Sequence, residues 1–203
     1  MTRASGGRRQ SVTMLILTEG ESEKVYFDTF RGRDSHVAVV PIVAKRNDSK
    51  NLIAYCAKQA DEYGIDIENG DTVSVVIDVD QRTRSELEEI EAQCAENGME
   101  LYISNISFEY WLVLHYKDLT KACSQEDLEH TLTECLKRRY VKSEGIGRKT
   151  IEKNLDSAIK RAKGRISDEL GRNRLCAGLD PSTTVHFLVR KIIDGAKNQG
   201  DLK

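Results

Sequence analysis

The run VTMLILT at Val12–Thr18, followed at once by EGESE at Glu19–Glu23, is the most informative segment of the sequence for the fold. Its apolar side chains are almost uninterrupted, which is typical of a strand buried on both faces of a parallel sheet. Gly20 permits a tight turn after this strand, and Ser22 is a residue type that caps a following helix. We therefore expect a buried strand that turns directly into a helix.

Three further strand-like runs follow: VAVVPIV at Val37–Val43, TVSVVID at Thr72–Asp78 and the shorter LYIS at 101–104. Helical patterns separate and follow these runs, at 22–31, 50–63, 84–97, 108–116, 125–138, 148–163 and 182–194. Asp180 and Pro181 are expected to open the last helix, and 164–178 is expected to be a loop. Strands that alternate with helices are typical of a mostly parallel sheet.

We therefore predict an α/β fold with a four-stranded, mostly parallel sheet flanked by helices. Residues 1–11 are expected to form a basic, flexible arm, and residues 12–120 the α/β core. Residues 121–203 are expected to form a helical, basic C-terminal part that packs on this core.

Composition narrows the class of protein. With 203 residues, 39% hydrophobic and 32% charged, the chain can bury a full-sized core and is neither collagen-like nor wholly disordered. No apolar run reaches the ~18 residues of a membrane span, and the first ten residues lack the apolar stretch of a signal peptide. Five scattered cysteines without a CxxC pair indicate reduced thiols. We expect a cytoplasmic protein.

Charge is distributed unevenly along the chain. Residues 85–116 contain seven acidic side chains and no Lys or Arg, whereas 137–174 contain 13 Lys and Arg against 5 Asp and Glu. This division is compatible with a metal site beside a track for a polyanion. A well-solvated helical surface would give the same division.

Acidic residues follow two of the predicted buried strands. Glu19 follows the first strand, and Asp78 and Asp80 end the third. The carboxyl ends of parallel strands meet at one edge of a sheet, so these side chains should share a crevice, with Glu23 facing it from the first helical turn. Carboxylates this close repel one another unless protons or a cation neutralise them. Oxygen ligands without His or Cys favour one or two Mg²⁺ or Mn²⁺ ions, which support phosphodiester cleavage.

The order of these motifs resembles the Toprim fold of topoisomerases, bacterial primases and overcoming-lysogeny-defect nucleases. The narrower similarity is to the RloB-like family, also called AbiLii in phage abortive-infection systems. It is carried by four blocks, which are EGESEKVYF at 19–27, DVD at 78–80, SNISFEYWLVLHY at 104–116 and DPSTTVH at 180–186. The similarity covers nearly the whole chain and makes the predicted core Toprim-like.

The resemblance implies a metal-dependent nuclease, usually encoded with an AAA-type ATPase in an anti-phage defence locus. By that resemblance Glu19 contacts metal and takes part in acid/base chemistry, while Asp78 and Asp80 hold Mg²⁺. Glu23 is then the extra ligand of a two-metal site. The motifs do not distinguish DNA from RNA, transfer RNA included, as the substrate.

Other residues are candidates with more than one interpretation. Glu109 is either a further catalytic ligand of metal or water, or an acid that favours the start of its helix. His115, between Leu114 and Tyr116, is predicted to be a packed histidine. Candidate contacts to nucleic acid are Arg138, Arg139, Lys142, Arg148 and Lys149, and candidates for a structural or phosphate-contacting role are Ser182, Thr183 and His186.

Two other functions compete with the nuclease. One keeps the fold without catalysis, as a nucleic-acid-binding or adaptor subunit of a defence complex. The other is a phosphatase, because the segment 78–83 (DVDQRT) resembles the nucleophile loop of the haloacid-dehalogenase type. That loop requires Thr or Val where Arg82 stands. The motif also normally opens the first strand, whereas here it follows the third.

Overall fold

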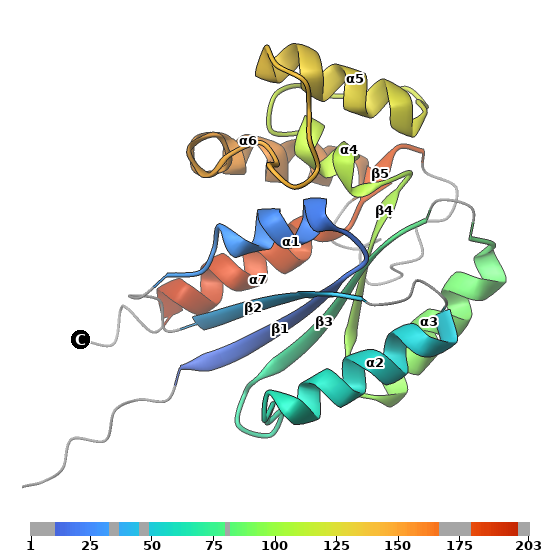
Figure 1. Cartoon of the computed structure of the whole chain (residues 1–203), viewed down its shortest axis with the longest axis vertical. Coiled ribbons are helices and arrows are strands. Elements are labelled where there is room, and N and C mark those ends of the chain that lie inside the picture. Colours follow the sequence, from blue (N-terminus) through green and yellow to red (C-terminus); the bar gives the residue numbers. More distant parts are fainter. Residues whose placement is uncertain (1–10, 33–36, 45–48, 80–81, 167–179, 199–203) are drawn as a thin grey trace, which may run out of the picture.

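The structure is a computed structural model, and it describes residues 11–32, 37–44, 49–79, 82–166 and 180–198. These residues form one sheet with the strand order β2-β1-β3-β4-β5, shown in Figure 1. The strands are β1 (Val12–Thr18), β2 (Val37–Val43), β3 (Thr72–Asp78), β4 (Glu100–Asn105) and β5 (Ser182–Thr183). The first four are parallel and β5 is antiparallel to β4. The predicted α/β class and mostly parallel sheet are confirmed, but the sheet has five strands rather than four.

The fifth strand lies where the sequence pattern predicts the first turn of the last helix. Ser182 and Thr183 pair with Asn105 and Ser104 of β4, and the two hydroxyl oxygens of Thr183 and Ser104 are 2.9 Å apart. The backbone N–H and C=O of Ile103 also bond to the residue after β5. Hydroxyl side chains compete with helical hydrogen bonds in this way, and α7 therefore begins only at Val185.

Helices lie on both faces of the sheet (Figure 1). In chain order they are α1 (Glu21–Asp28), α2 (Ser49–Glu62), α3 (Arg84–Glu96), α4 (Phe108–Val113), α5 (Gln125–Leu136), α6 (Arg148–Arg165) and α7 (Val185–Asn198). α2 and α3 cover one face, and α1 and α7 cover the other, with α4, α5 and α6 beyond them at one end of the sheet. Apart from the start of α7, the predicted helices are confirmed to within a few residues at each end.

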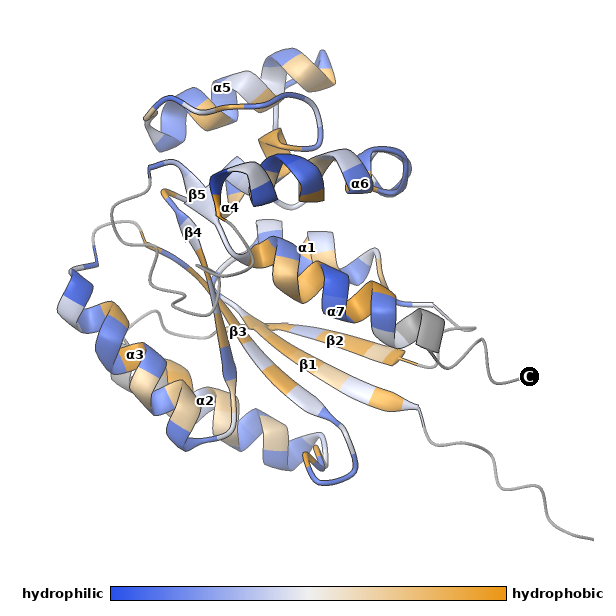
Figure 2. Ribbon diagram, turned by 180° about the vertical axis from the view of Figure 1, so that it is seen from behind, coloured by the Kyte–Doolittle hydropathy of each residue, from blue (hydrophilic) through white to orange (hydrophobic). Residues whose placement is uncertain are grey.

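The sheet separates two apolar cores. Leu15 and Leu17 of β1 pack with α2 and α3, whereas Met14 and Ile16 pack with the helices of the other face. Figure 2 shows apolar colouring along the strands and along the inner sides of the helices. Burying one such side chain contributes about 1.5–3 kcal/mol, so both layers stabilise β1. Two-sided burial explains why the polar alternation of an exposed sheet is missing from VTMLILT.

The connection from β3 to α3 is held by a capping box. The Thr83 hydroxyl accepts a hydrogen bond from the Glu86 backbone N–H, and the Thr83 backbone N–H donates to the Glu86 carboxylate. Such reciprocal bonds satisfy two backbone donors at a helix start. Arg82 immediately precedes this cap, and its backbone N–H donates to the carbonyl of Val79.

Two further properties follow from the described residues. Across the described ranges, no helix is both long and apolar enough to cross a bilayer. Cys56, Cys94, Cys123 and Cys135 are free thiols. Cys176, together with most of the predicted loop at 164–178, lies outside the described residues.

Candidate functional site: a buried acidic cluster at the sheet edge

Two strands bring Glu19 and Asp78 together. β1 and β3 are parallel neighbours, and Glu19 and Asp78 lie at their carboxyl ends. The backbone N–H of Asp78 donates a hydrogen bond of 2.9 Å to Oε2 of Glu19. Residues 59 positions apart in the sequence therefore touch, as the strand pattern predicts.

Glu23 reaches the same edge from the first turn of α1 and is only 4% exposed. A Cβ atom on Gly20 would lie 3.1 Å from Oε2 of Glu23, closer than ordinary van der Waals contact. A side chain at position 20 would therefore require the Glu23 carboxylate to shift by a few tenths of an ångström. Gly20 is also the N-cap of α1, a role that the sequence pattern gave to Ser22.

Ser22 instead belongs to a buried hydrogen-bond network around Glu109. The Ser22 hydroxyl donates to Oε1 of Glu109 over 2.8 Å, and the Tyr140 hydroxyl donates to the same oxygen over 3.1 Å. The two hydroxyl oxygens are 2.9 Å apart. Glu109 is 1% exposed at the start of α4, so three segments far apart in sequence fix its orientation.

Lys142 lies at the open side of this network. Its Nζ is 3.6 Å from Oε1 of Glu109 and 3.4 Å from Oε1 of Glu129, and its side chain is about half exposed. Tyr140, two residues earlier, is buried, so its ring cannot stack on a nucleic-acid base. The segment between α5 and α6 thus contributes a hydroxyl and an ammonium group to the acidic residues of the sheet edge.

We call Glu19, Glu23, Asp78 and Glu109 the acidic cluster. Burial raises the pKa of Glu23 to about 7, and the charges of Glu109 and Glu19 add to this effect. Burial likewise raises the pKa of Asp78 well above its usual range, with further contributions from Glu23, Glu109 and Glu19. The four carboxylates are therefore close enough for their charges to disfavour ionisation of Glu23 and Asp78.

The same charges act in the opposite sense on the neighbouring cation. Burial lowers the pKa of the Lys142 ammonium, but the nearby charges of Glu109 and Glu129 more than offset this and raise it overall. Lys142 is therefore held in its charged form beside the acidic cluster.

Arg82 is an unpredicted member of the site. Its guanidinium pairs with both carboxylate oxygens of Glu19 and also donates to the backbone carbonyl of Asp78 over 2.6 Å. Both oxygens of Glu19 are thereby engaged by Arg82, with the backbone N–H of Asp78 also bonded to Oε2. The ion pair joins residues 63 positions apart, and residue spacing carries no signal for such a pair.

The acidic cluster offers only carboxylate oxygens, which are the atoms that hard divalent cations prefer as ligands. Oδ1 of Asp78 is buried without a hydrogen-bond partner among the described residues. Within the same residues, no three acidic, His or Cys side chains converge into a ready-made metal-binding group. Asp80, a further predicted ligand, lies outside the described residues.

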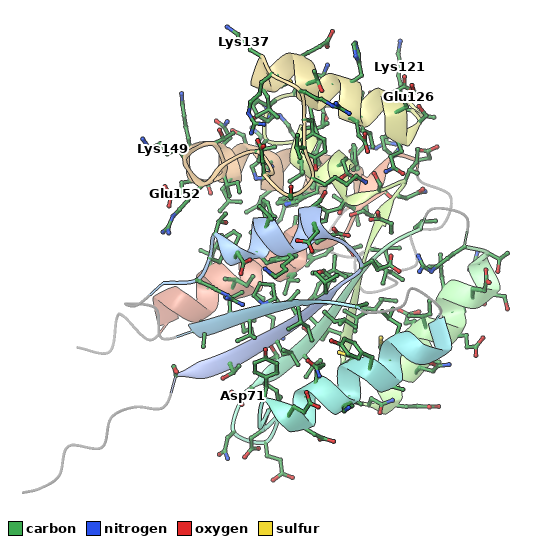
Figure 3. All side chains as sticks on the ribbon, viewed as in Figure 1. Asp71, Lys121, Glu126, Lys137, Lys149 and Glu152 are labelled. Carbon is green, nitrogen blue, oxygen red and sulfur yellow. The ribbon has the colours of Figure 1, made fainter. Side chains whose placement is uncertain are left out.

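Lys142, one of the five predicted nucleic-acid contacts, lies beside Glu109, and the other four are at the surface near the start of α6. Arg138 and Arg148 form exposed ion pairs with Glu144 and Glu152, each over 2.7 Å. Arg139 is exposed, and Figure 3 shows Lys149 projecting outward from the start of α6. Exposed ion pairs contribute about 0–1 kcal/mol, so these cations can exchange their partners at little cost.

The histidine motifs are internal. His115 is 1% exposed, with Nδ1 3.1 Å from the Trp111 carbonyl and Nε2 3.3 Å from the Tyr26 hydroxyl. This confirms a packed histidine. Ser182, Thr183 and His186 are also buried, and Nδ1 of His186 lies 3.0 Å from the Thr183 carbonyl. The structure places these three at the junction of β5 and α7.

Fold and site together define an α/β protein with a mostly parallel sheet and a buried cluster of carboxylates at the carboxyl ends of its strands. The chain belongs to the RloB-like protein family, whose family model matches residues 14–192. That range runs from β1 into α7 and contains the whole acidic cluster. Comparison with curated proteins and with solved structures gave no significant match.

Proposed function

We propose that the chain is a Mg²⁺- or Mn²⁺-dependent nuclease of the Toprim type, which cleaves phosphodiester bonds in DNA or RNA. The observation that carries this proposal is the acidic cluster, in which four segments supply carboxylates to one buried place. Burying mutually repelling acids costs stability, and groups with strongly perturbed pKa values gather at functional sites. A bound cation would turn this repulsion into attraction.

Each residue of the site has a role in this proposal. Asp78 and Glu23 would hold the metal, together with Glu19 if Arg82 released it, and Asp80 would be a further ligand. A divalent ion bound there would polarise the phosphate and lower the pKa of water. Glu109, oriented by Ser22 and Tyr140, would position the water or a second ion.

Lys142 and the exposed basic residues near α6 would neutralise negative charge on the phosphate groups of the substrate. Lys142 lies beside Glu109 and would face the charge that develops on the phosphate during cleavage. Arg138, Arg139, Arg148 and Lys149 lie farther out and would follow the backbone of the substrate. We further propose, from the family resemblance, that the protein acts in the cytoplasm in anti-phage abortive infection with an AAA-type ATPase.

The test is cleavage by the purified full-length chain with Mg²⁺ or Mn²⁺ on plasmid DNA, single-stranded DNA and transfer RNA. Asp78→Asn should lower the cleavage rate by ~100-fold or more, because it removes a ligand and a charge at the proposed metal site. Glu21→Gln is the matched control, since Glu21 is exposed on the same helix as Glu23. Cleavage that survives both Asp78→Asn and chelation would overturn the proposal.

One observation favours a non-catalytic alternative. Glu19 is already neutralised by Arg82, which is what a site without metal would require. In an adaptor or nucleic-acid-binding subunit, Asp78→Asn would leave nucleic-acid binding unchanged, and no metal would promote cleavage by the wild-type chain. The same set of variants therefore distinguishes the two functions.

A further inference from the structure

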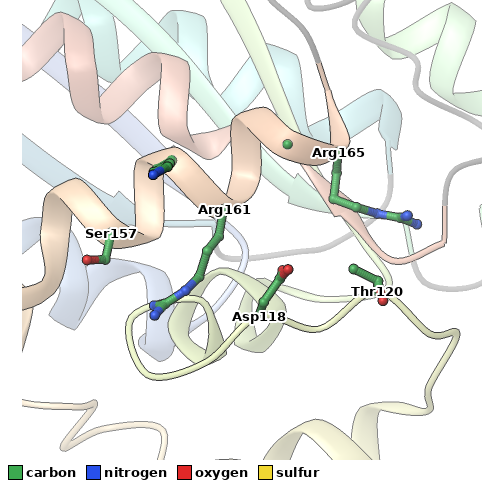
Figure 4. A pocket seen from close by; sticks show the side chains of 7 residues that line it. Asp118, Thr120, Ser157, Arg161 and Arg165 are labelled. Atoms are coloured by element: carbon green, nitrogen blue, oxygen red, sulfur yellow. The ribbon is translucent and has the colours of Figure 1, made fainter.

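A second polar site lies away from the acidic cluster, between α6 and the segment that follows α4. It is a cleft of about 470 Å³, and the residues that face it include Asp118, Thr120, Ser157, Lys160, Arg161 and Arg165. Figure 4 shows Arg161 and Arg165 extending from α6 toward the segment that carries Asp118 and Thr120. The basic residues predicted from sequence to contact nucleic acid are not among them.

The two arginines of this cleft are held in place by backbone carbonyls. Arg161 donates to the carbonyl of Leu114, just after α4. Arg165 donates from Nε to the carbonyl of Pro181 over 3.1 Å and from Nη2 to that of Asp180 over 3.3 Å. A guanidinium has five N–H donors, so each arginine is fixed in position while further donors remain for a ligand. Fixing them beforehand reduces the entropy that binding would otherwise cost.

The charge and size of the cleft indicate what it accepts. Three cations face one carboxylate, and Lys160 is exposed and forms no ion pair with any residue that the structure describes. Ser157 and Thr120 add hydroxyl groups that can donate to an anion. Guanidinium groups match the geometry of phosphate oxygens. Among the described residues that line the cleft there is no aromatic side chain on which a base could stack.

The cleft also lies toward the same edge of the sheet as the acidic cluster. Asp78 pairs with Ser104 and Ser104 with Thr183, so two strand spacings, roughly 10 Å, separate Asp78 from β5. Arg165 holds the residues immediately before β5. Arg165, one of the residues that line the cleft, is thus bonded to the segment that leads into β5, the strand two spacings from Asp78.

We propose that this cleft binds phosphate esters and that its ligand is the sugar–phosphate backbone of the nucleic acid on which the acidic cluster acts. The choice of nucleic acid as the source of the phosphates rests on the proposed function. Recognition of backbone phosphates is independent of base sequence and strongly dependent on salt. The cleft therefore positions a strand and does not select its sequence.

The experiment measures binding with no cleavage, in chelator, by fluorescence anisotropy of labelled single-stranded DNA and RNA 20-mers. Lys160→Glu reverses the charge at an exposed position of α6, which should leave folding intact. Lys58→Glu is the matched control, because Lys58 is an exposed lysine of α2, on the opposite face of the sheet. We expect Lys160→Glu to weaken binding about tenfold and to lower the salt-dependence slope by about 1, with no change for Lys58→Glu.

Competition identifies the source of the phosphates. If the 20-mers bind and ATP or tripolyphosphate competes only at far higher concentration, the ligand is a nucleic-acid backbone. If ATP binds in a manner that depends on Lys160 and the 20-mers do not, the site is for phosphate esters but takes a free nucleotide. If Lys160→Glu and wild type bound the 20-mers equally, or if both charge reversals weakened binding equally, the proposal that the cleft binds phosphate esters would be wrong. If Lys160→Glu lost binding but the wild-type chain showed no metal-dependent cleavage, the phosphate-binding cleft would be supported and the proposed nuclease function would be rejected.

Discussion

Replacing Glu23 by Gln should make the metal-free protein more stable at alkaline pH. Burial and neighbouring charges raise the pKa of Glu23 from 4.5 to about 7 in the folded chain. A carboxylate with a raised folded pKa contributes stability that is present below its unfolded pKa and is lost as pH rises through the folded value. At pH 8 the folded chain therefore carries an ionised group that it disfavours, whereas a glutamine side chain keeps the shape of the neutral form.

The magnitude follows from the size of the pKa shift. A change from 4.5 to about 7 is about 2.5 units, and at 1.36 kcal/mol per unit this corresponds to about 3 kcal/mol at pH 8. For a chain of this length, that free energy raises the midpoint of thermal unfolding by about 6–12 °C. At pH 4, where Glu23 is largely protonated in both states, the two proteins should have nearly equal stability.

Urea unfolding at pH 4, 6 and 8 in chelator, followed by circular dichroism, measures this difference directly. Glu21→Gln should change the free energy of unfolding by less than about 0.5 kcal/mol at every pH, because Glu21 is exposed. Adding Mn²⁺ at pH 8 should stabilise wild type and reduce or reverse the advantage of Glu23→Gln, since a ligand of the native state adds stability by mass action. If the gain in stability of Glu23→Gln over wild type were the same at pH 4 and pH 8, or were absent at pH 8, ionisation of Glu23 would not be what destabilises the wild-type protein.

Arg82→Gln should tighten Mn²⁺ binding about tenfold in calorimetry, because it removes a competitor for both oxygens of Glu19; weaker binding would show that Arg82 helps to form the site. His115→Gln should remove about 3 kcal/mol of acid sensitivity between pH 7 and pH 4, because burial lowers the pKa of His115 from 6.5 to about 4. The wild-type protein loses this stability as pH falls through that interval. If the free energies of unfolding of the two proteins fell equally between pH 7 and pH 4, the lowered pKa of His115 would be wrong. Tyr140→Phe should cost about 1 kcal/mol and slow any cleavage, whereas Tyr63→Phe, at a half-exposed position, should do neither.

Most of the sheet could be predicted from the sequence because a buried strand appears there as a continuous run of apolar residues. The bounds of β1, β2 and β3 agree with the apolar runs. β1 and β3 are buried on both faces, whereas β2, at the edge of the sheet, has buried and half-buried residues. β5 has no such apolar run. It has two residues, and the partner hydroxyls and backbone of β4 stabilise it in place of an apolar pattern of its own.

Part of the candidate site could likewise be predicted from the sequence, and part could not. Glu19, Glu23 and Asp78 were predictable because strand ends and a first helical turn have fixed places in a parallel sheet. The bonds from Arg82 to Glu19 and from Tyr140 to Glu109 connect segments whose relative placement depends on the packing of whole helices. Local spacing does not encode such packing, so the partners of the acids emerged only from the structure.

The order in which the site's parts appear along the chain bears on its synthesis by the ribosome. Glu19, Glu23 and Asp78 emerge early, Glu109 emerges later, and Tyr140 and Lys142, which orient and neutralise Glu109, emerge last. β5, which closes the sheet against β4, lies some 80 residues after its partner strand. A nascent chain therefore carries its repelling acids before the groups that orient and neutralise Glu109 have been synthesised. For the nuclease that we propose, this order would delay assembly of the site until the segment after α5 and then β5 have emerged.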